Sequence, residues 1–148
     1  MTIIDCVRQQ APLAVVPECS EEGCELRMNG LRNYIVLKGE LARRDIEICD
    51  CIIFLEGNPL IVALVELKGK TVHASAVVTK LTNGTNAALE ILANSDTRQR
   101  PIFRHLVLAK RWHRGTEFRV ITSRRIHAAG KKYLILPKPC GFSLAQAI

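Results

Sequence analysis

The sequence predicts a single α/β domain in which helices flank a mixed central sheet, and three observations lead to this class. Two apolar runs separated by a short turn indicate a buried antiparallel hairpin. A longer stretch in which apolar residues recur with helical spacing follows the hairpin, and a third apolar run follows that stretch. Because 148 residues is the usual size of one domain, we treat residues 1–148 as a single unit.

The first part of the chain gives the weakest signals. Residues 1–16 are compatible with a short helix followed by a strand. Asn29 and Gly30 form a dipeptide that is favoured in two-residue hairpin turns. We therefore expect residues 25–28 to pair with residues 33–37.

The central hairpin is predicted most clearly. Residues 51–55 and 60–65 are almost entirely apolar, as in strands that are covered on both faces. Residues 56–59 between them contain the glycine, asparagine and proline that turns favour. The preceding residues 40–48 are compatible with a helical turn or with a strand that continues into the hairpin.

A helix and a returning strand are expected next. Thr71 is a candidate N-cap, and apolar residues recur with helical spacing from there to residue 92. Asn83 and Gly84 are expected to kink this helix without ending it. The apolar residues 102–110 predict a strand that lies parallel in the sheet after the helical crossover.

The C-terminal part is predicted to add another hairpin and carries most of the positive charge. Residues 125–128 and 132–136 are its expected strands. Lysine and arginine outnumber aspartate and glutamate by 21 to 14, a formal charge of +7, and the excess lies after residue 97. Such an excess suits a polyanion, because neutralised phosphates release counterions. The expected nucleic-acid contacts are Arg111, Arg114, Arg124, Arg125, Lys131 and Lys132.

Composition also bears on location and on the cysteines. No apolar run approaches the roughly 18 residues that a membrane span requires. The N-terminal residues lack the basic and then apolar pattern of a signal peptide, so we expect a cytoplasmic protein without membrane contact. In that compartment the six cysteines are expected to be reduced and to serve as small core residues.

Charged residues interrupt the central hairpin at one end. Asp50 precedes its first strand, and Glu66 and Lys68 follow the second apolar run. Antiparallel pairing brings Asp50 and Glu66 to the same end of the sheet, while strand alternation puts Glu66 and Lys68 on one face. Ionised side chains are rarely buried in a sheet unless they are paired or bind a metal. A bare ion pair between Asp50 and Lys68 would leave the third charge unexplained.

This arrangement resembles the core of the PD-(D/E)XK nuclease superfamily, to which restriction endonucleases and Holliday-junction resolvases belong. The resemblance rests on Asp50 at the start of one strand and on Glu66-x-Lys68 at the end of the next, followed by a helix and a strand. It covers about residues 34–110. It implies a restriction endonuclease-like core, to which the C-terminal hairpin is an addition.

Three positions differ from the usual family pattern or leave it open. Cys49 stands where many members have proline. Lys80 is the only long polar side chain in the helical stretch where members often have a glutamine. Members often have an upstream acid as well, and here either Glu40 or Glu47 is a candidate.

The resemblance implies a metal-dependent endonuclease that hydrolyses phosphodiester bonds in DNA, with Asp50, Glu66 and Lys68 as catalytic residues. Mg²⁺ or Mn²⁺ would be held by Asp50, Glu66 and the backbone carbonyl of Leu67, with Glu40 as a further candidate ligand. Lys68 beside the metal would hold or deprotonate the attacking water, which an arginine could not do.

Other functions use the same residues. A non-catalytic nucleic-acid-binding or assembly subunit of a defence or repair complex would keep the fold and the basic surface. An RNA-processing endonuclease would use the same site. Because one site cuts one strand, we expect a homodimer or a subunit of a larger nucleoprotein complex. Trp112, within a basic segment, is either a core residue or a stacking surface for a base.

Overall fold

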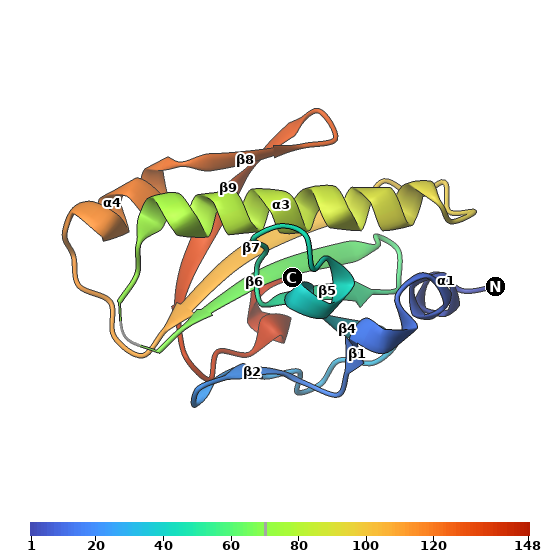
Figure 1. Cartoon of the computed structure of the whole chain (residues 1–148), viewed down its shortest axis with the longest axis horizontal. Helices are drawn as coiled ribbons and strands as arrows, with labels where there is room; N and C mark the ends of the chain where they lie inside the picture. Colours follow the sequence, from blue (N-terminus) through green and yellow to red (C-terminus); the bar gives the residue numbers. More distant parts are fainter. Residues whose placement is uncertain (70) are drawn as a thin grey trace.

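The computed structural model describes residues 1–69 and 71–148 (Figure 1). Its strands are β1 (Val15–Val16), β2 (Cys19–Glu21), β3 (Cys24–Leu26), β4 (Tyr34–Lys38), β5 (Cys51–Leu55), β6 (Ile61–Lys68), β7 (Ile102–Ala109), β8 (Arg125–Ala128) and β9 (Lys131–Pro139). Its α-helices are α1 (Ile3–Gln10), α2 (Gly39–Ala42), α3 (Ala74–Ala93) and α4 (Thr116–Ser123), and two 3-10 helices are η1 (Pro12–Ala14) and η2 (Leu144–Ala147).

Seven of these strands form one mixed sheet in the order β1-β4-β5-β6-β7-β9-β8, and β2 and β3 form a separate hairpin. Strands β1, β4, β5 and β6 are antiparallel neighbours. Strands β6, β7 and β9 run parallel, and β8 returns antiparallel to β9. The chain is therefore an α/β protein with a mixed sheet, as predicted.

The central elements are confirmed. In the hairpin of β5 and β6, Cys51 lies opposite Val65 and Leu55 lies opposite Ile61. The chain then crosses through α3 into β7, which pairs with β6 in parallel, as a helical crossover requires. The predicted C-terminal hairpin is also present, and β9 extends it by pairing with β7.

Other expectations are corrected. Strand β3 pairs with β2, whereas β4 pairs with β1 and β5, so the predicted hairpin around Asn29 and Gly30 is wrong. Helix α3 begins after His73 rather than after Thr71. The side chain of the N-cap residue His73 makes no capping bond, and the Glu117 carboxylate from α4 accepts a hydrogen bond from the Ala74 nitrogen at 2.9 Å instead. Helix α4 lies in a basic segment for which no element was predicted.

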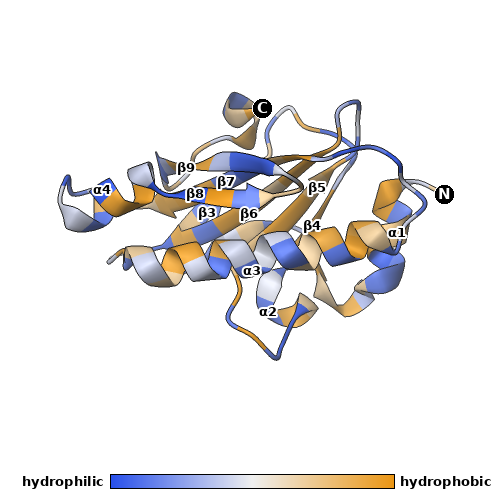
Figure 2. Cartoon of the chain, turned by 90° about the horizontal axis from the view of Figure 1, so that it is seen from above, coloured by the Kyte–Doolittle hydropathy of each residue, from blue (hydrophilic) through white to orange (hydrophobic). Residues whose placement is uncertain are grey.

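Two apolar layers cover the sheet. On one face α3 packs with α1 against the even-numbered residues of β5 and β6, such as Ile52 and Leu64. On the other face, residues of the β2–β3 hairpin and of η2 pack against the odd-numbered residues, such as Ile53 and Val65. Helix α3 and η2 accordingly lie on opposite sides of the sheet in Figure 2. The alternation of strand side chains thus separates two cores.

Two disulfides join the β2–β3 hairpin to the rest of the fold, so the expectation of reduced cysteines is wrong for four of the six, whereas Cys6 and Cys49 are free thiols. Cys19 is bonded to Cys51 at the start of β5, and Cys24 is bonded to Cys140 after β9. The partners are 32 and 116 residues apart, so their spacing in the sequence gave no sign of the pairing. In the described part of the chain, no helix has the length and apolar character needed to cross a membrane.

Candidate active site at the end of the central hairpin

The main chain around Asp50 is held from two sides. The Cys49 nitrogen donates to the Lys80 carbonyl in α3 at 3.1 Å, and the Gly39 nitrogen donates to the Asp50 carbonyl at 2.8 Å. A side chain on Gly39 would collide with the Cys49 carbonyl. The end of β4 and the middle of α3 therefore fix the position from which the Asp50 side chain projects.

The Asn83-Gly84 pair in α3 contributes to this packing. The Asn83 side-chain nitrogen donates to the Glu47 carbonyl at 2.6 Å. Gly84 is required because a Cβ atom there would collide with the Cys49 sulfur. The helix runs from Ala74 to Ala93 without a break at these two residues. Asn83 and Gly84 therefore allow α3 to pack closely against the segment that precedes β5.

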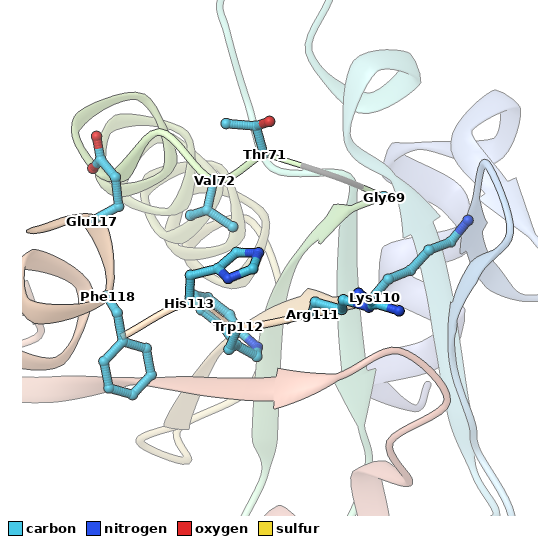
Figure 3. A pocket seen from close by; sticks show the side chains of 9 residues that line it. All are labelled: Gly69, Thr71, Val72, Lys110, Arg111, Trp112, His113, Glu117 and Phe118. Carbon is cyan, nitrogen blue, oxygen red and sulfur yellow. The ribbon is translucent and has the colours of Figure 1, made fainter. Parts of the chain in front are cut away.

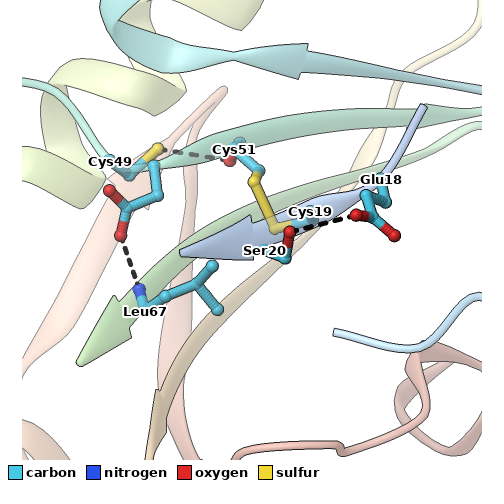
Figure 4. Close-up of a disulfide and its surroundings, with 7 residues drawn as sticks. Glu18, Cys19, Ser20, Cys49, Cys51 and Leu67 are labelled. Atoms are coloured by element: carbon cyan, nitrogen blue, oxygen red, sulfur yellow. Dashed lines mark hydrogen bonds between the residues drawn. A yellow bond between two sulfur atoms is a disulfide. The ribbon is translucent and has the colours of Figure 1, made fainter. Parts of the chain in front are cut away.

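The Asp50 carboxylate accepts a backbone hydrogen bond from β6 that a neighbouring strand would otherwise accept. Strand β5 begins one residue later, and Oδ2 of Asp50 accepts a hydrogen bond from the Leu67 nitrogen at 2.7 Å. This bond ends at the Leu67 nitrogen in Figure 4, close to the Cys19–Cys51 disulfide. Because the N–H and C=O groups of one strand residue point to the same side, the Leu67 carbonyl also faces away from β7, toward Asp50.

Glu66 is a buried carboxylate between two lysines. Its residue is only 1 % exposed. Oε2 lies 3.3 Å from the Nζ atom of Lys68 and 3.3 Å from that of Lys80. Among the described residues, however, neither Glu66 oxygen has a hydrogen-bond partner of acceptable geometry. The two ammonium groups therefore balance the charge of Glu66 at Oε2, whereas Oε1 has no polar partner among the described residues.

The two carboxylates influence each other. Burial, and then the negative charge of Glu66, raise the pKa of Asp50 to about 7, although the bond from Leu67 acts in the opposite direction. Burial is the largest effect on Lys80 and lowers its pKa, but the charges of Glu66 and Asp50 outweigh it and raise the pKa overall. The site thus holds more negative charge than it accommodates easily at neutral pH, a condition that a bound cation relieves.

A pocket of about 630 Å³ opens over these groups. The predicted residues Asp50, Glu66, Leu67 and Lys68 all line it, together with Lys80. The pocket is completed by residues that were not predicted, namely Glu21, Glu22, Gly69, Thr71 and Lys110.

Sequence reasoning missed the contribution of the β2–β3 hairpin because it assigned this segment to a different strand pair. Glu21 and Glu22 reach the pocket from the β2–β3 hairpin, which the disulfides Cys19–Cys51 and Cys24–Cys140 join to the central sheet. The charge of Glu21 also contributes to the raised pKa of Asp50. No local signal marks either glutamate, whereas Lys80 was marked as the one long polar side chain of its stretch.

The two candidate upstream acids lie to one side. Glu40 and Glu47 line a neighbouring pocket of about 290 Å³, which also contacts Asp50 and Lys80. The Glu40 side chain is 71 % exposed and pairs with Lys38 at 3.2 Å. The two pockets share Asp50 and Lys80, but neither Glu40 nor Glu47 is among the described residues that line the larger pocket with Glu66.

The predicted basic residues do not form one cluster. Arg111 and Arg114 are exposed in the loop after β7, at the same end of the sheet as the site. Lys131 and Lys132 begin β9, whose other end at Pro139 lies beside Ala109 at the site end. At 3.3 Å per residue they are roughly 20–25 Å from that end. Arg124 and Arg125, between α4 and β8, are exposed as well.

The donor set fits Mg²⁺ or Mn²⁺. These hard cations take carboxylate and carbonyl oxygens and keep several waters. Oε1 of Glu66 has no partner among the described residues, Asp50 has a second oxygen besides the one that accepts from Leu67, and strand geometry puts the Leu67 carbonyl on the same edge of β6 as its nitrogen. Comparison of the chain with protein-family models, curated proteins and solved structures found no match.

Proposed function

We propose that the protein is a metal-dependent endonuclease that hydrolyses phosphodiester bonds in DNA. The observation that carries this proposal is the buried Glu66 carboxylate at the pocket, whose Oε2 atom pairs with Lys68 and Lys80 and whose Oε1 atom has no partner among the described residues. Asp50 shares the pocket, with a raised pKa. Buried acids with perturbed pKa values in a pocket are typical of catalytic sites.

The order of the elements supports the proposal. Strands β4, β5 and β6 form an antiparallel meander, α3 crosses over, and β7 pairs in parallel with β6. This order resembles the restriction endonuclease-like core described above, with Asp50 and Glu66-x-Lys68 at the ends of adjacent strands. The hairpin of β8 and β9 would then be an addition to that core.

In this mechanism Asp50, Glu66 and the Leu67 carbonyl would hold Mg²⁺ or Mn²⁺. The metal supplies stabilisation of the charge on the phosphate and a lower pKa for the attacking water. Lys68, whose Nζ atom is 3.3 Å from Glu66, would hold that water as an ammonium group or, in its neutral amine form, accept the proton of the water. Lys80 balances the charge of Glu66 from the helix side and keeps the carboxylate aimed at the pocket.

The nucleic acid reaches the site over the loop after β7. Arg111 and Arg114 are the predicted basic residues nearest to the site end of the sheet, and they are exposed for contact with phosphates. Cleavage of both strands would require a homodimer or a larger nucleoprotein complex. We keep the cytoplasm as the proposed location. Disulfides are rare in a reducing cytoplasm, so the two disulfides argue for an oxidising compartment or for one of the disulfide-rich cytoplasms known from hyperthermophiles.

The test is incubation with plasmid, single-stranded and branched DNA and with RNA, in Mg²⁺ or Mn²⁺ and in chelator. We expect cleavage of DNA that chelator abolishes and that Asp50→Asn and Glu66→Gln each remove. Asp45→Asn is the matched control, because this exposed acid pairs with Arg43 away from the pocket. Mg²⁺ should raise the melting temperature of the wild type and of the control, but not that of the site variants.

Two other outcomes would change the assignment. DNA binding without cleavage under all metal conditions would favour the non-catalytic subunit of a defence or repair complex. Cleavage of RNA in preference to every DNA substrate would favour an RNA-processing endonuclease at the same site.

A further inference from the structure

A second pocket, of about 520 Å³, adjoins the candidate active site. The two pockets share Gly69, Thr71 and Lys110. Lys110 lies at their junction because it lines both pockets. A ligand bound at Glu66 can therefore extend directly into the second pocket.

The walls of this pocket combine flat apolar surfaces with cations. Figure 3 shows Trp112, His113 and Val72 at its centre, with Phe118 on one side and Lys110 and Arg111 on the other. The one acid in the lining, Glu117, accepts the hydrogen bond from the Ala74 nitrogen and is engaged at the start of α3. Lys110 and Arg111 outnumber this one acid, so the net charge of the lining is positive.

The aromatic surface is held in position before any ligand binds. The Trp112 indole nitrogen donates to the Lys138 carbonyl at 2.8 Å. The Phe118 ring meets the Trp112 ring edge-on, with centroids 5.7 Å apart. Trp112 is nevertheless only partly buried, so part of its ring remains available to a ligand.

We propose that this pocket receives the base of an unpaired DNA nucleotide next to the scissile phosphate. The link to cleavage rests on the proposed nuclease function. Aromatic side chains stack on bases while neighbouring cations pair with phosphates, a combination typical of sites for single strands. The volume suits a small molecule, not a double helix, so the base enters unstacked. The substrate class is therefore single-stranded DNA, or duplex DNA with an unpaired nucleotide.

Trp112 provides the measurement, because it is the only tryptophan of the chain. Its fluorescence is recorded in chelator, without cleavage, while the full chain is titrated with a short oligothymidylate. The same titration is made with an abasic oligonucleotide of equal length, with a blunt duplex and with oligouridylate. Stacking predicts strong quenching by oligothymidylate and little change with the abasic strand or the duplex.

Variants separate stacking from structure. Trp112→Leu should weaken binding of labelled oligothymidylate roughly 10- to 100-fold, while Trp112→Phe retains most of the affinity. Arg111→Ala should weaken binding several-fold, whereas Arg98→Ala, an equal loss of exposed charge beyond the far end of β7, should not. Circular dichroism checks that each variant is folded. If Trp112→Leu does not fold, the wild-type fluorescence titration and the comparison of Arg111→Ala with Arg98→Ala still test the proposal.

The outcomes distinguish this inference from the proposed function. Quenching that persists in Glu66→Gln, even if no variant cleaves DNA, supports the base pocket independently of the nuclease. Cleavage of duplex DNA with unchanged Trp112 fluorescence would overturn the base pocket and leave the nuclease proposal intact. A stronger response to oligouridylate than to oligothymidylate would overturn the assignment to DNA.

Discussion

Two buried polar side chains face α3 from neighbouring strands of the sheet, Glu66 from β6 and His105 from β7. They are 1 % and 0 % exposed. Nε2 of His105 lies 2.8 Å from the Thr85 hydroxyl, which itself donates to the Leu81 carbonyl at 2.8 Å. The hydroxyl proton is thus in use, so His105 is the donor through Nε2. Burial lowers its pKa to about 4 and keeps the ring neutral.

The difference lies in what surrounds each group. His105 is enclosed by rings, with the Phe103 and Tyr133 centroids 6.2 and 5.8 Å away. Glu66 borders a pocket and two lysines whose side chains are 24 % and 27 % exposed. A neutral group in an apolar enclosure contributes to stability, whereas a charged group at a pocket with movable cations is equipped for binding. Burial alone therefore does not identify a functional site.

The largest expected effect concerns the Glu66 side of this comparison. Lys68→Ala should reduce DNA cleavage by at least about 10²-fold, because general acid–base groups contribute roughly 10²- to 10⁴-fold. Stability should change little, since Lys80 still pairs with Glu66. Cleavage rates and urea unfolding measure both, with Arg98→Ala, beyond the far end of β7, as the exposed control. Cleavage at the wild-type rate would remove Lys68 from the mechanism.

An intermediate effect is expected on the His105 side. Thr85→Val should lower the free energy of unfolding by about 1–3 kcal/mol, because it leaves a buried N–H group of His105 without an acceptor. Cleavage by the folded protein should be unchanged. Thr79→Val makes the same change at an exposed position of α3, where the hydroxyl bonds only the Ser75 carbonyl, and should have little effect. A loss of cleavage without a loss of stability would contradict the distinction drawn here.

The smallest effect is an opposite dependence of stability on pH. His105 has a lowered pKa, so the unfolded chain binds the extra proton between about pH 6.5 and 4, and this contribution to stability is lost as pH falls. Asp50 has a raised pKa, so the folded chain binds the extra proton between about pH 3.8 and 7, and its contribution is lost as pH rises. In the wild type, the contributions of His105 and Asp50 to the free energy of unfolding therefore change with pH in opposite directions.

Single variants should separate these slopes. In chelator, Asp50→Asn leaves the His105 contribution, so stability should increase more steeply with pH than in wild type. His105→Gln leaves the Asp50 contribution, so the free energy of unfolding should increase less with pH than in wild type, or decrease. Urea unfolding at several pH values between 4.5 and 7 measures both. Parallel curves for the two variants would show that the groups do not differ in the way proposed.

Local patterns in the sequence predicted the elements on which the candidate site is built. The apolar runs of β5 and β6 and the short turn between them define a hairpin, and its geometry brings Asp50 and Glu66 to the same end. Strand alternation predicted that the side chains of Glu66 and Leu67 point to opposite faces of the sheet. Leu67 indeed packs in the apolar layer on the face away from α3. Periodicities of about 2 and 3.6 residues act over a few neighbours, so they can be read without the fold.

What the sequence alone determined was therefore the α/β class, the central hairpin, the crossover helix and the charged residues at one end of the sheet. Only the tertiary structure decided the partners of those charges. Lys80 pairs with Glu66, Glu21 joins the pocket from a hairpin held by a disulfide, and Trp112 lines the adjoining pocket. The physical reason is that burial, ion pairing and disulfide bonding depend on distances between residues far apart in the chain, which local periodicity does not encode.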